Sequence, residues 1–441
     1  MRKSGIFALP VLLFCFTFFA PASLAQETGF ARYIVDSMSA PGMYGRGYVN
    51  HGGLIASEFL SREFFKAGII PFSDSYSQEF RFPMNTFPGA MVLNAGGRDL
   101  IPGIEFTVKA SSPSVNRMYE VILLDSALFE NPRKLERRIG KDPSGSMIAF
   151  NRRQLKGDAA KLADSMLATN FAGAGGFMLI NPGEKLIWSV SPGGIPSEYP
   201  VVEVLEQALP RKLAKAALTI DAEFFEEYPV KNILGFVPGH RNPDSVLVIS
   251  AHYDHLGMMG RTAVFPGAND NASGVAMMLD LARYFADSAN RPSFSVAFMA
   301  FAGEEAGLKG SEYYTENPVF PLGNIKFLIN LDMVGTGSEG ITMVNGEQFP
   351  AYYERMAKIN ADNEYLLTVR KRGESCNSDH CPFYKKGVPA VFIYSMGREH
   401  REYHTLNDRG GLVPFSEYED IFRLLRDFIC SFEPELPAED S

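Results

Sequence analysis

VLVISAH, residues 246–252, is the stretch of sequence that decides the fold. It is an almost continuous apolar run, as are FSVAFMAF at 294–301 and KFLINLDM at 326–333, and such runs are typical of strands buried on both faces of a sheet. Between the first two runs, residues 271–288 carry apolar side chains every three or four positions, which indicates a helix. This alternation predicts an α/β fold with a mixed, mainly parallel central sheet sandwiched by helices.

A different pattern precedes this region. From about residue 78 to residue 226, short apolar runs alternate with Pro and Gly, which predicts a smaller β-rich unit with one helix near residues 160–169. A chain of 441 residues also exceeds the size of one typical domain. We therefore expect residues 26–79 and 227–434 to form a discontinuous α/β domain, and residues 80–226 to form a domain inserted into it.

Residues 1–25 have the pattern of a secretory signal peptide. Arg2 and Lys3 precede an apolar run at 6–20, and small residues follow at 23–25. The run is shorter than the roughly 20 residues that a membrane-spanning helix needs. We expect a secreted or periplasmic protein with no membrane attachment after cleavage; an uncleaved membrane anchor is the alternative.

Composition excludes one class of partner and limits the disulfides. The formal net charge is -9 and no basic run is present, so a nucleic-acid partner is not expected. Cys15 lies in the signal peptide, which leaves Cys376, Cys381 and Cys430. An odd number permits one disulfide within the chain, and Cys376 and Cys381 are the closest pair in the sequence.

Acidic and histidine side chains gather at one expected edge of the sheet. The residues at or just after the carboxyl ends of predicted parallel strands are His252, Glu304, Glu305 and Asp332. Ligands of open α/β sheets bind at this edge, because strand ends and loops converge on a crevice there. Asp270 and His404 come from loops that can reach the same crevice.

These residue types favour a metal site over isolated polar positions. Singly, each has an ordinary interpretation: a histidine satisfied at a strand end, a glutamate pair at a helix start, an aspartate cap. Together, imidazole and carboxylate groups suit zinc, with cobalt or manganese as alternatives. Five ligands exceed what one tetrahedral zinc takes while a position stays open for water, so we predict two metals that share one carboxylate. Asp270, in a Gly-flanked loop, is the natural bridge.

Six motifs carry a family resemblance. In chain order they are AHYDHLG, PGANDNASG, AGEEAGLKGS, INLDMVG, SDHCPF and HREYHTLND, and together they resemble the co-catalytic zinc aminopeptidases, family twenty-eight of the metallopeptidases. The resemblance covers about residues 29–79 and 232–432, and implies a single α/β domain with a mixed eight-stranded sheet. Residues 168–185 and 193–204 resemble the protease-associated insert of exported peptidases; a β insert with no named relative is the alternative.

The resemblance also implies the metal ligands. His252, Asp270 and Asp332 would hold one zinc ion, and Asp270, Glu305 and His404 would hold the other, which gives two Zn²⁺ per chain. The peptide bond after Asp270 would be cis.

Other roles follow from the same resemblance. Glu304 would be the general base, Tyr403 would donate to the oxyanion, and Asp254 would hydrogen-bond the imidazole two residues before it and fix its tautomer. His255 is a possible ligand in place of His252, but the match to the family favours His252. His380 lies in a loop that the family places near the substrate.

The expected activity is that of an exported zinc aminopeptidase. Hydroxide held between the metals would hydrolyse the N-terminal bond of peptides with a free amino terminus, with Glu304 as the base. The alternatives are a glutaminyl cyclase with one zinc, a carboxypeptidase or dipeptidase with two, and a noncatalytic receptor-like binding protein. The chain has neither an HExxH zinc helix nor a GxSxG elbow, so the corresponding hydrolase classes lack their motifs.

Overall fold

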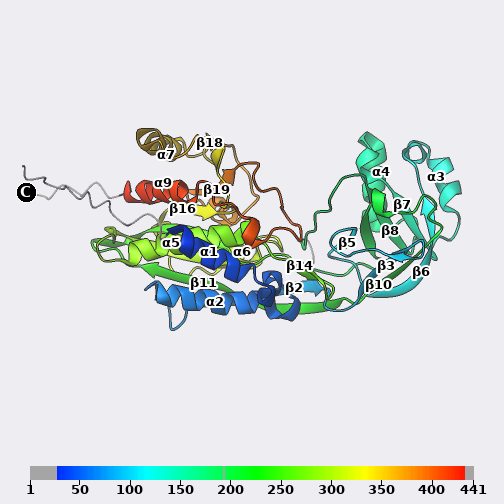
Figure 1. Cartoon of the computed structure of the whole chain (residues 1–441), viewed down its shortest axis with the longest axis horizontal. Helices are drawn as coiled ribbons and strands as arrows, with labels where there is room; N and C mark the ends of the chain where they lie inside the picture. The colour runs from blue at the N-terminus through cyan, green and yellow to red at the C-terminus, as the bar shows by residue number, and fades with distance from the viewer. Residues whose placement is uncertain (1–26, 192–193, 433–441) are drawn as a thin grey trace, which may run out of the picture.

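The computed structural model describes residues 27–191 and 194–432, which form two lobes (Figure 1). The expected signal peptide lies outside the described residues. No helix within the described ranges is long and apolar enough to cross a membrane.

The larger lobe is built on a nine-stranded mixed sheet. Its strands, in spatial order, are β1 (Ile70–Pro71), β11 (Glu223–Val237), β15 (Phe294–Phe301), β12 (Asn242–His252), β16 (Ile325–Leu331), β19 (Ala390–Met396), β17 (Gly340–Val344) and β18 (Val369–Lys371), and β2 (Ser77–Thr86) also pairs with β11. The four central strands β15, β12, β16 and β19 are parallel, whereas β11 and β17 run antiparallel to their central neighbours. The predicted fold class is confirmed, although the sheet has nine strands where the resemblance implied eight.

Helices cover both faces of this sheet. The elements of one face are α1 (Glu27–Met38), α2 (Gly52–Lys66), α5 (Gly274–Ala286) and α9 (Tyr418–Cys430), with α7 (Pro350–Asn363) against α9, and those of the other are α6 (Lys309–Glu316) and α8 (His380–Lys385). Successive strand residues point to opposite faces, so Leu247 and Ile249 join one core while Val248 joins the other. Two buried faces explain why the strand sequences are continuously apolar.

The smaller lobe is an eight-stranded sheet with two helices. Its strands, in spatial order, are β4 (Arg98–Asp99), β3 (Met91–Ala95), β10 (Lys215–Ile220), β6 (Val115–Leu123), β7 (Ser146–Phe150), β8 (Gly176–Asn181), β9 (Val201–Leu205) and β5 (Phe106–Val108). Helix α4 (Gly157–Thr169) lies at the predicted position. Helix α3 (Pro132–Ile139) was not predicted; it is short, and its only aliphatic side chains are Leu135, which is buried, and Ile139, which packs beside it, while Asn131 caps it.

A two-stranded ribbon connects the lobes. β2 and β11 pair antiparallel from Ser77 beside Ile233 to Thr86 beside Glu223, and they extend from the large sheet to the smaller lobe (Figure 1). The expected domain limits at 79–80 and 226–227 fall within these strands. A short hairpin, β13 (Gly257–Met259) with β14 (Ala263–Phe265), lies beside the same junction.

Candidate metal centre

The structure brings all six candidate residues of the metal site to one cavity. His252 ends β12, Glu304 and Glu305 follow β15, and Asp332 follows β16. The cavity has a volume of about 270 Å³, and the side chains that line it are His252, Asp270, Glu304, Glu305, Asp332, Met333, Arg372, Asn377, Phe392, Tyr394, Tyr403 and His404. The parallel strands thus place the acids at their carboxyl ends, as expected for this class of sheet.

One group of donor atoms surrounds Nε2 of His252. This nitrogen is 3.5 Å from Oδ1 of Asp270, 3.4 Å from Oδ1 of Asp332 and 4.0 Å from Oε2 of Glu304. Donor atoms bound to one tetrahedral zinc at 2.0–2.1 Å are about 3.3 Å apart. His252 is therefore spaced from each of the two aspartates as two ligands of a single ion are.

A second group surrounds Nε2 of His404. This nitrogen is 3.2 Å from Oδ2 of Asp270 and 3.1 Å from Oε2 of Glu305. The two oxygens of Asp270 thus face two different imidazoles, which is the arrangement of a bridging carboxylate. Nδ1 of His255 is 2.7 Å from Oε1 of Glu305, so His255 lies in this second group and contacts the far oxygen of Glu305.

One buried oxygen tests whether the site suits a cation. Oδ1 of Asp332 has no hydrogen-bond partner among the described residues, and Nε2 of His252 lies 3.4 Å from it. A buried carboxylate oxygen is costly unless it is paired or coordinates a metal. Imidazole nitrogens and carboxylate oxygens are the donors that zinc takes, so the residues fit two zinc ions.

Backbone carbonyls orient both imidazoles. Nδ1 of His252 donates to the carbonyl of Asp254 at 3.2 Å, and Nδ1 of His404 donates to the carbonyl of Trp188 at 2.8 Å. These bonds leave Nε2 of each ring directed into the cavity. The carboxylate of Asp254 is 3.7 Å from the ring of His252 and accepts instead from the amides of Glu304 and Glu305.

Asp270 is held by a network around its own turn. The peptide bond from Asp270 to Asn271 is cis, as predicted. The carboxylate of Asp408 accepts from the amides of Asn269 and Asp270 at 2.8 and 3.0 Å. The side chain of Asn271 donates to the carbonyl of Leu331 at 2.9 Å, which ties this turn to the end of β16.

Arg46 is a buried cation that the sequence analysis missed. It is 0% exposed, and its guanidinium donates to backbone carbonyls of Tyr253, Gly267 and Asp270, in the loops that carry the site. It also reaches the carbonyls of Met38 and Pro266. Burial lowers the pKa of Arg46 to about 10, although nearby carboxylates oppose this. An arginine between two glycines, in YGRGY, was the available signal.

The pKa values in the cavity diverge. Burial raises the pKa of Glu304 well above its usual range, and neighbouring carboxylates add to this, although His252 opposes it. Burial also acts to raise the pKa of Asp270, but its contacts with His252 and His404 hold that pKa well below the usual range. The ionised carboxylate of Asp270 thus attracts positive charge into the cavity, whereas Glu304 binds a proton more readily than an ordinary glutamate. A raised pKa of this kind is typical of a general acid or base.

Tyr403 and His380 have different positions. Tyr403 lines the cavity, is 44% exposed and stacks on the ring of His404 at 3.8 Å. His380 is buried outside it, and its Nε2 donates to the carbonyl of Ser375 at 2.8 Å. Burial lowers the pKa of His380 to about 4, so this histidine is neutral at physiological pH, and it is not among the side chains that line the cavity.

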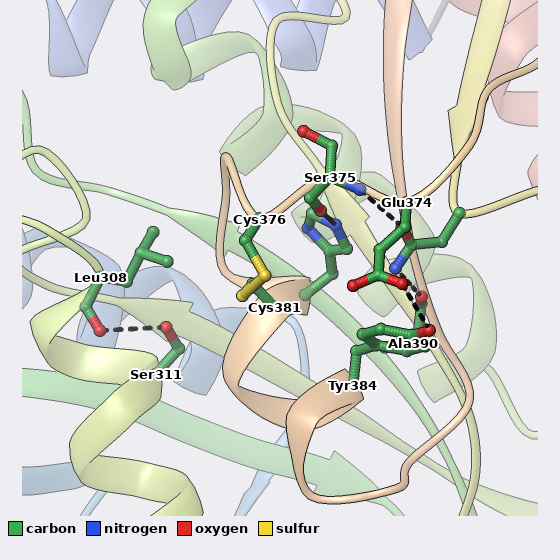
Figure 2. Close-up of a disulfide and its surroundings, with 10 residues drawn as sticks. Leu308, Ser311, Glu374, Ser375, Cys376, Cys381, Tyr384 and Ala390 are labelled. Carbon is green, nitrogen blue, oxygen red and sulfur yellow. Dashed lines mark hydrogen bonds between the residues drawn. A yellow bond between two sulfur atoms is a disulfide. The ribbon is translucent and has the colours of Figure 1, made fainter.

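A disulfide closes the loop before α8. Cys376 and Cys381 are bonded (Figure 2), and Tyr384 donates to Glu374 at 3.1 Å across the same loop. Within this loop, the hydroxyl of Ser378 donates to Oδ2 of Asp332 at 3.0 Å. The closed loop therefore orients one of the candidate metal ligands from the α8 side.

Comparison with known proteins agrees with this geometry. Residues 232–429 match the model of peptidase family M28. The resemblance stated from the six motifs is thus confirmed.

Curated relatives of the chain include zinc metalloproteases and an aminopeptidase. The chain is 42% identical to a "Probable zinc metalloprotease" of Pyricularia oryzae, over 26% of its own length and 23% of that protein's. It is 26% identical to "Aminopeptidase YwaD" of Bacillus subtilis, over 72% and 67% of the two chains. The structure resembles that of BSAP, a zinc aminopeptidase from Bacillus subtilis, with a TM-score of 0.69, 19% identity and 94% and 97% coverage. The last similarity concerns the fold.

Proposed function

We propose that this protein is an exported zinc aminopeptidase that hydrolyses the N-terminal bond of peptides with a free amino terminus. The observation that carries the proposal is Asp270, whose two oxygens face His252 and His404, each completed by a further buried acid. The name of YwaD supports an aminopeptidase, and that of the Pyricularia oryzae relative supports a zinc metalloprotease. His252, Asp270 and Asp332 would bind one zinc ion, and Asp270, Glu305 and His404 the other.

Each role matches a group in the cavity. Bound zinc would supply Lewis acidity toward the scissile carbonyl and lower the pKa of water. Glu304 lines the cavity 4.0 Å from Nε2 of His252 and has a raised pKa, which suits a base that accepts a proton from water and delivers it to the leaving amine. Tyr403 stands at the exposed side of His404, where its hydroxyl would donate to the developing oxyanion.

The walls of the cavity favour a peptide substrate. Surplus carboxylates would attract the ammonium group of a free amino terminus. Met333, Phe392 and Tyr394 supply apolar contact for a side chain. A single-zinc cyclase would leave His252 and Asp332 without a purpose, and a receptor would need neither Glu304 nor the ligands.

We also propose that residues 80–226 form an inserted domain. The support is that β2 and β11 leave the large sheet side by side, and that the strands between them form a sheet of their own. Limited proteolysis near Thr86 and Glu223 would release this lobe as a stable fragment if the proposal is right.

Glu304→Gln tests the proposed activity. The variant should bind two zinc ions, because Glu304 is not among the ligands, but lose at least about a hundredfold of kcat, as general-base removal does. Metal analysis and hydrolysis of aminoacyl-nitroanilides, with and without chelator, measure both. The control is Glu312→Gln, a solvent-exposed glutamate of α6, which should behave as the wild type.

Three results would contradict the proposal. An active Glu304→Gln enzyme would remove Glu304 from its role. Wild-type protein that holds fewer than two zinc ions at saturation would remove the shared carboxylate, and wild-type protein that binds both ions but cuts no aminoacyl substrate would point to a carboxypeptidase or to a binding protein.

A further inference from the structure

A loop of the smaller lobe reaches the metal cavity of the larger one. Trp188 lies between β8 and β9, two strands of the eight-stranded sheet, whereas His404 follows β19 of the nine-stranded sheet. Figure 1 shows the segment after β19 extending to the smaller lobe, where it meets this loop. The two residues are 216 positions apart in the chain.

The contact between Trp188 and His404 is reciprocal. The imidazole Nδ1 of His404 donates to the carbonyl of Trp188 at 2.8 Å, and the amide of Trp188 donates to the carbonyl of His404 at 3.3 Å. His404 has a positive φ of 53°, which is uncommon outside glycine. One residue of the smaller lobe therefore holds both the ring and the main chain of His404.

Trp188 is itself firmly anchored. Its side chain is 3% exposed, and its indole Nε1 donates to the carbonyl of Val108 at 2.7 Å. Its ring packs on Phe265, with ring centroids 4.8 Å apart. Lys185, three residues earlier, donates to the carbonyl of Arg401 in the His404 loop. These contacts fix the carbonyl that receives the imidazole.

An imidazole that binds a metal through one nitrogen depends on the partner of the other. That partner sets the tautomer and ring orientation, and its loss typically weakens metal binding by about 10–100-fold. For His404, the partner in the described chain is the Trp188 carbonyl. We propose that Trp188 is a positioning residue for the His404 half of the metal centre, so that the smaller lobe sets how tightly one of the two zinc ions is held. This inference rests on the proposed zinc function.

The coupling must act in both directions. If the Trp188 loop strengthens zinc binding, zinc strengthens the hold on that loop by the same factor. Zinc bound near His404 should thus slow the hydrogen exchange of amides at 184–190, whereas amides of β7 should not respond.

Zinc titration of the metal-free full chain tests the proposal. Zinc is added against a competing fluorescent chelator to the wild type, Trp188→Ala, Trp188→Phe and Phe150→Leu. Trp188→Ala keeps the carbonyl but removes the side chain that anchors it, so it should weaken one of the two zinc ions by up to about 100-fold and leave the other nearly unchanged. Trp188→Phe keeps a ring against Phe265 and loses one hydrogen bond, so it should recover affinity to within about tenfold of the wild type.

Phe150→Leu is the matched control. Phe150 is buried in the core of the smaller lobe against Phe129, in a hydrophobic cluster that does not include Trp188. The substitution should lower the melting temperature of the lobe without changing either zinc affinity. If it weakens zinc as much as Trp188→Ala does, general loss of stability explains the effect and the proposal is overturned.

The remaining outcomes are also decisive. A folded Trp188→Ala protein that holds both ions with wild-type affinity overturns the proposal. If Trp188→Ala does not fold, hydrogen exchange of the wild type decides, and equal exchange at 184–190 with and without zinc overturns it. If the wild type binds no zinc, the proposed function itself is overturned. If the wild type binds two zinc ions and Trp188→Ala binds them equally well, only the role of Trp188 is overturned.

Discussion

Replacing Arg46 should cost more stability than replacing any surface arginine. Its guanidinium makes five hydrogen bonds, all to backbone carbonyls and all between 2.6 and 3.3 Å. In Arg46→Met, these carbonyls lose a charged partner, and each such bond contributes about 1.5–3 kcal/mol. The variant also avoids the burial of a cation, which costs several kcal/mol. The net loss in the free energy of unfolding should be about 3–5 kcal/mol.

Arg46→Lys separates geometry from charge. Lysine keeps the positive charge but has three donors in place of five, so at least two carbonyls lose their partner. At about 1.5 kcal/mol for each lost bond, the lower end of the range for charged groups, the expected loss is about 3 kcal/mol. Domain stabilities are about 5–15 kcal/mol, so both variants should fold.

Urea unfolding at 25 °C, followed by circular dichroism on metal-free protein, measures these losses. Arg152→Met is the control, because Arg152 makes two hydrogen bonds to the exposed carboxylate of Asp164, and such surface pairs contribute about 0–1 kcal/mol. An Arg46→Met protein within about 1 kcal/mol of wild type would refute the reasoning, since the five bonds would then have no net effect.

Two further predictions concern protons. Burial acts to lower the pKa of His404, but Glu305 and Asp270 raise it to about 11, so the metal-free ring is protonated at pH 7 and must become neutral to bind zinc. Zinc binding should therefore release at least about one proton, which calorimetry detects as an enthalpy that depends on the buffer. Equal enthalpies in all buffers would contradict this prediction. Burial acts to raise the pKa of Glu399, but hydrogen bonds from Ser338 and Ser416 hold it at about 2, below its ordinary 4.5. The contribution of Glu399 to stability is full above pH 4.5 and is lost as pH falls through 2. The free energy of unfolding of Glu399→Gln should thus be about 1 kcal/mol lower than that of the wild type at pH 7, after discount for solvent screening of this exposed group, and equal to it near pH 2. Urea unfolding at both pH values measures the difference, and a difference that does not change with pH would contradict the prediction.

The central sheet could be predicted because its sequence pattern has one physical cause. Strands such as β12 and β15 are buried on both faces, and continuous apolar runs are the direct result. The acids at their carboxyl ends interrupt this pattern, which is why Asp332 and Glu305 stood out. Helix α5 was equally visible through its apolar period.

Other features left little trace in the sequence. Trp188 and Arg46 act through backbone carbonyls, which every residue has, so no residue pattern announces their partners. His255 was set aside because its neighbour matched the motif, yet it contacts Glu305. Partners that lie far apart in the chain become visible only when the fold brings them together.

The ribbon of β2 and β11 offers one place at which the intervening segment could be removed from the chain. Thr86 and Glu223 face each other across the ribbon, so a two-residue turn such as Asn-Gly could join them as a β-hairpin. Such an excision would produce a shorter protein in which the candidate zinc ligands all remain but the loop that carries Trp188 is gone. Its engineer would need to give His404 a new hydrogen-bond acceptor, because the deleted lobe carries the original one.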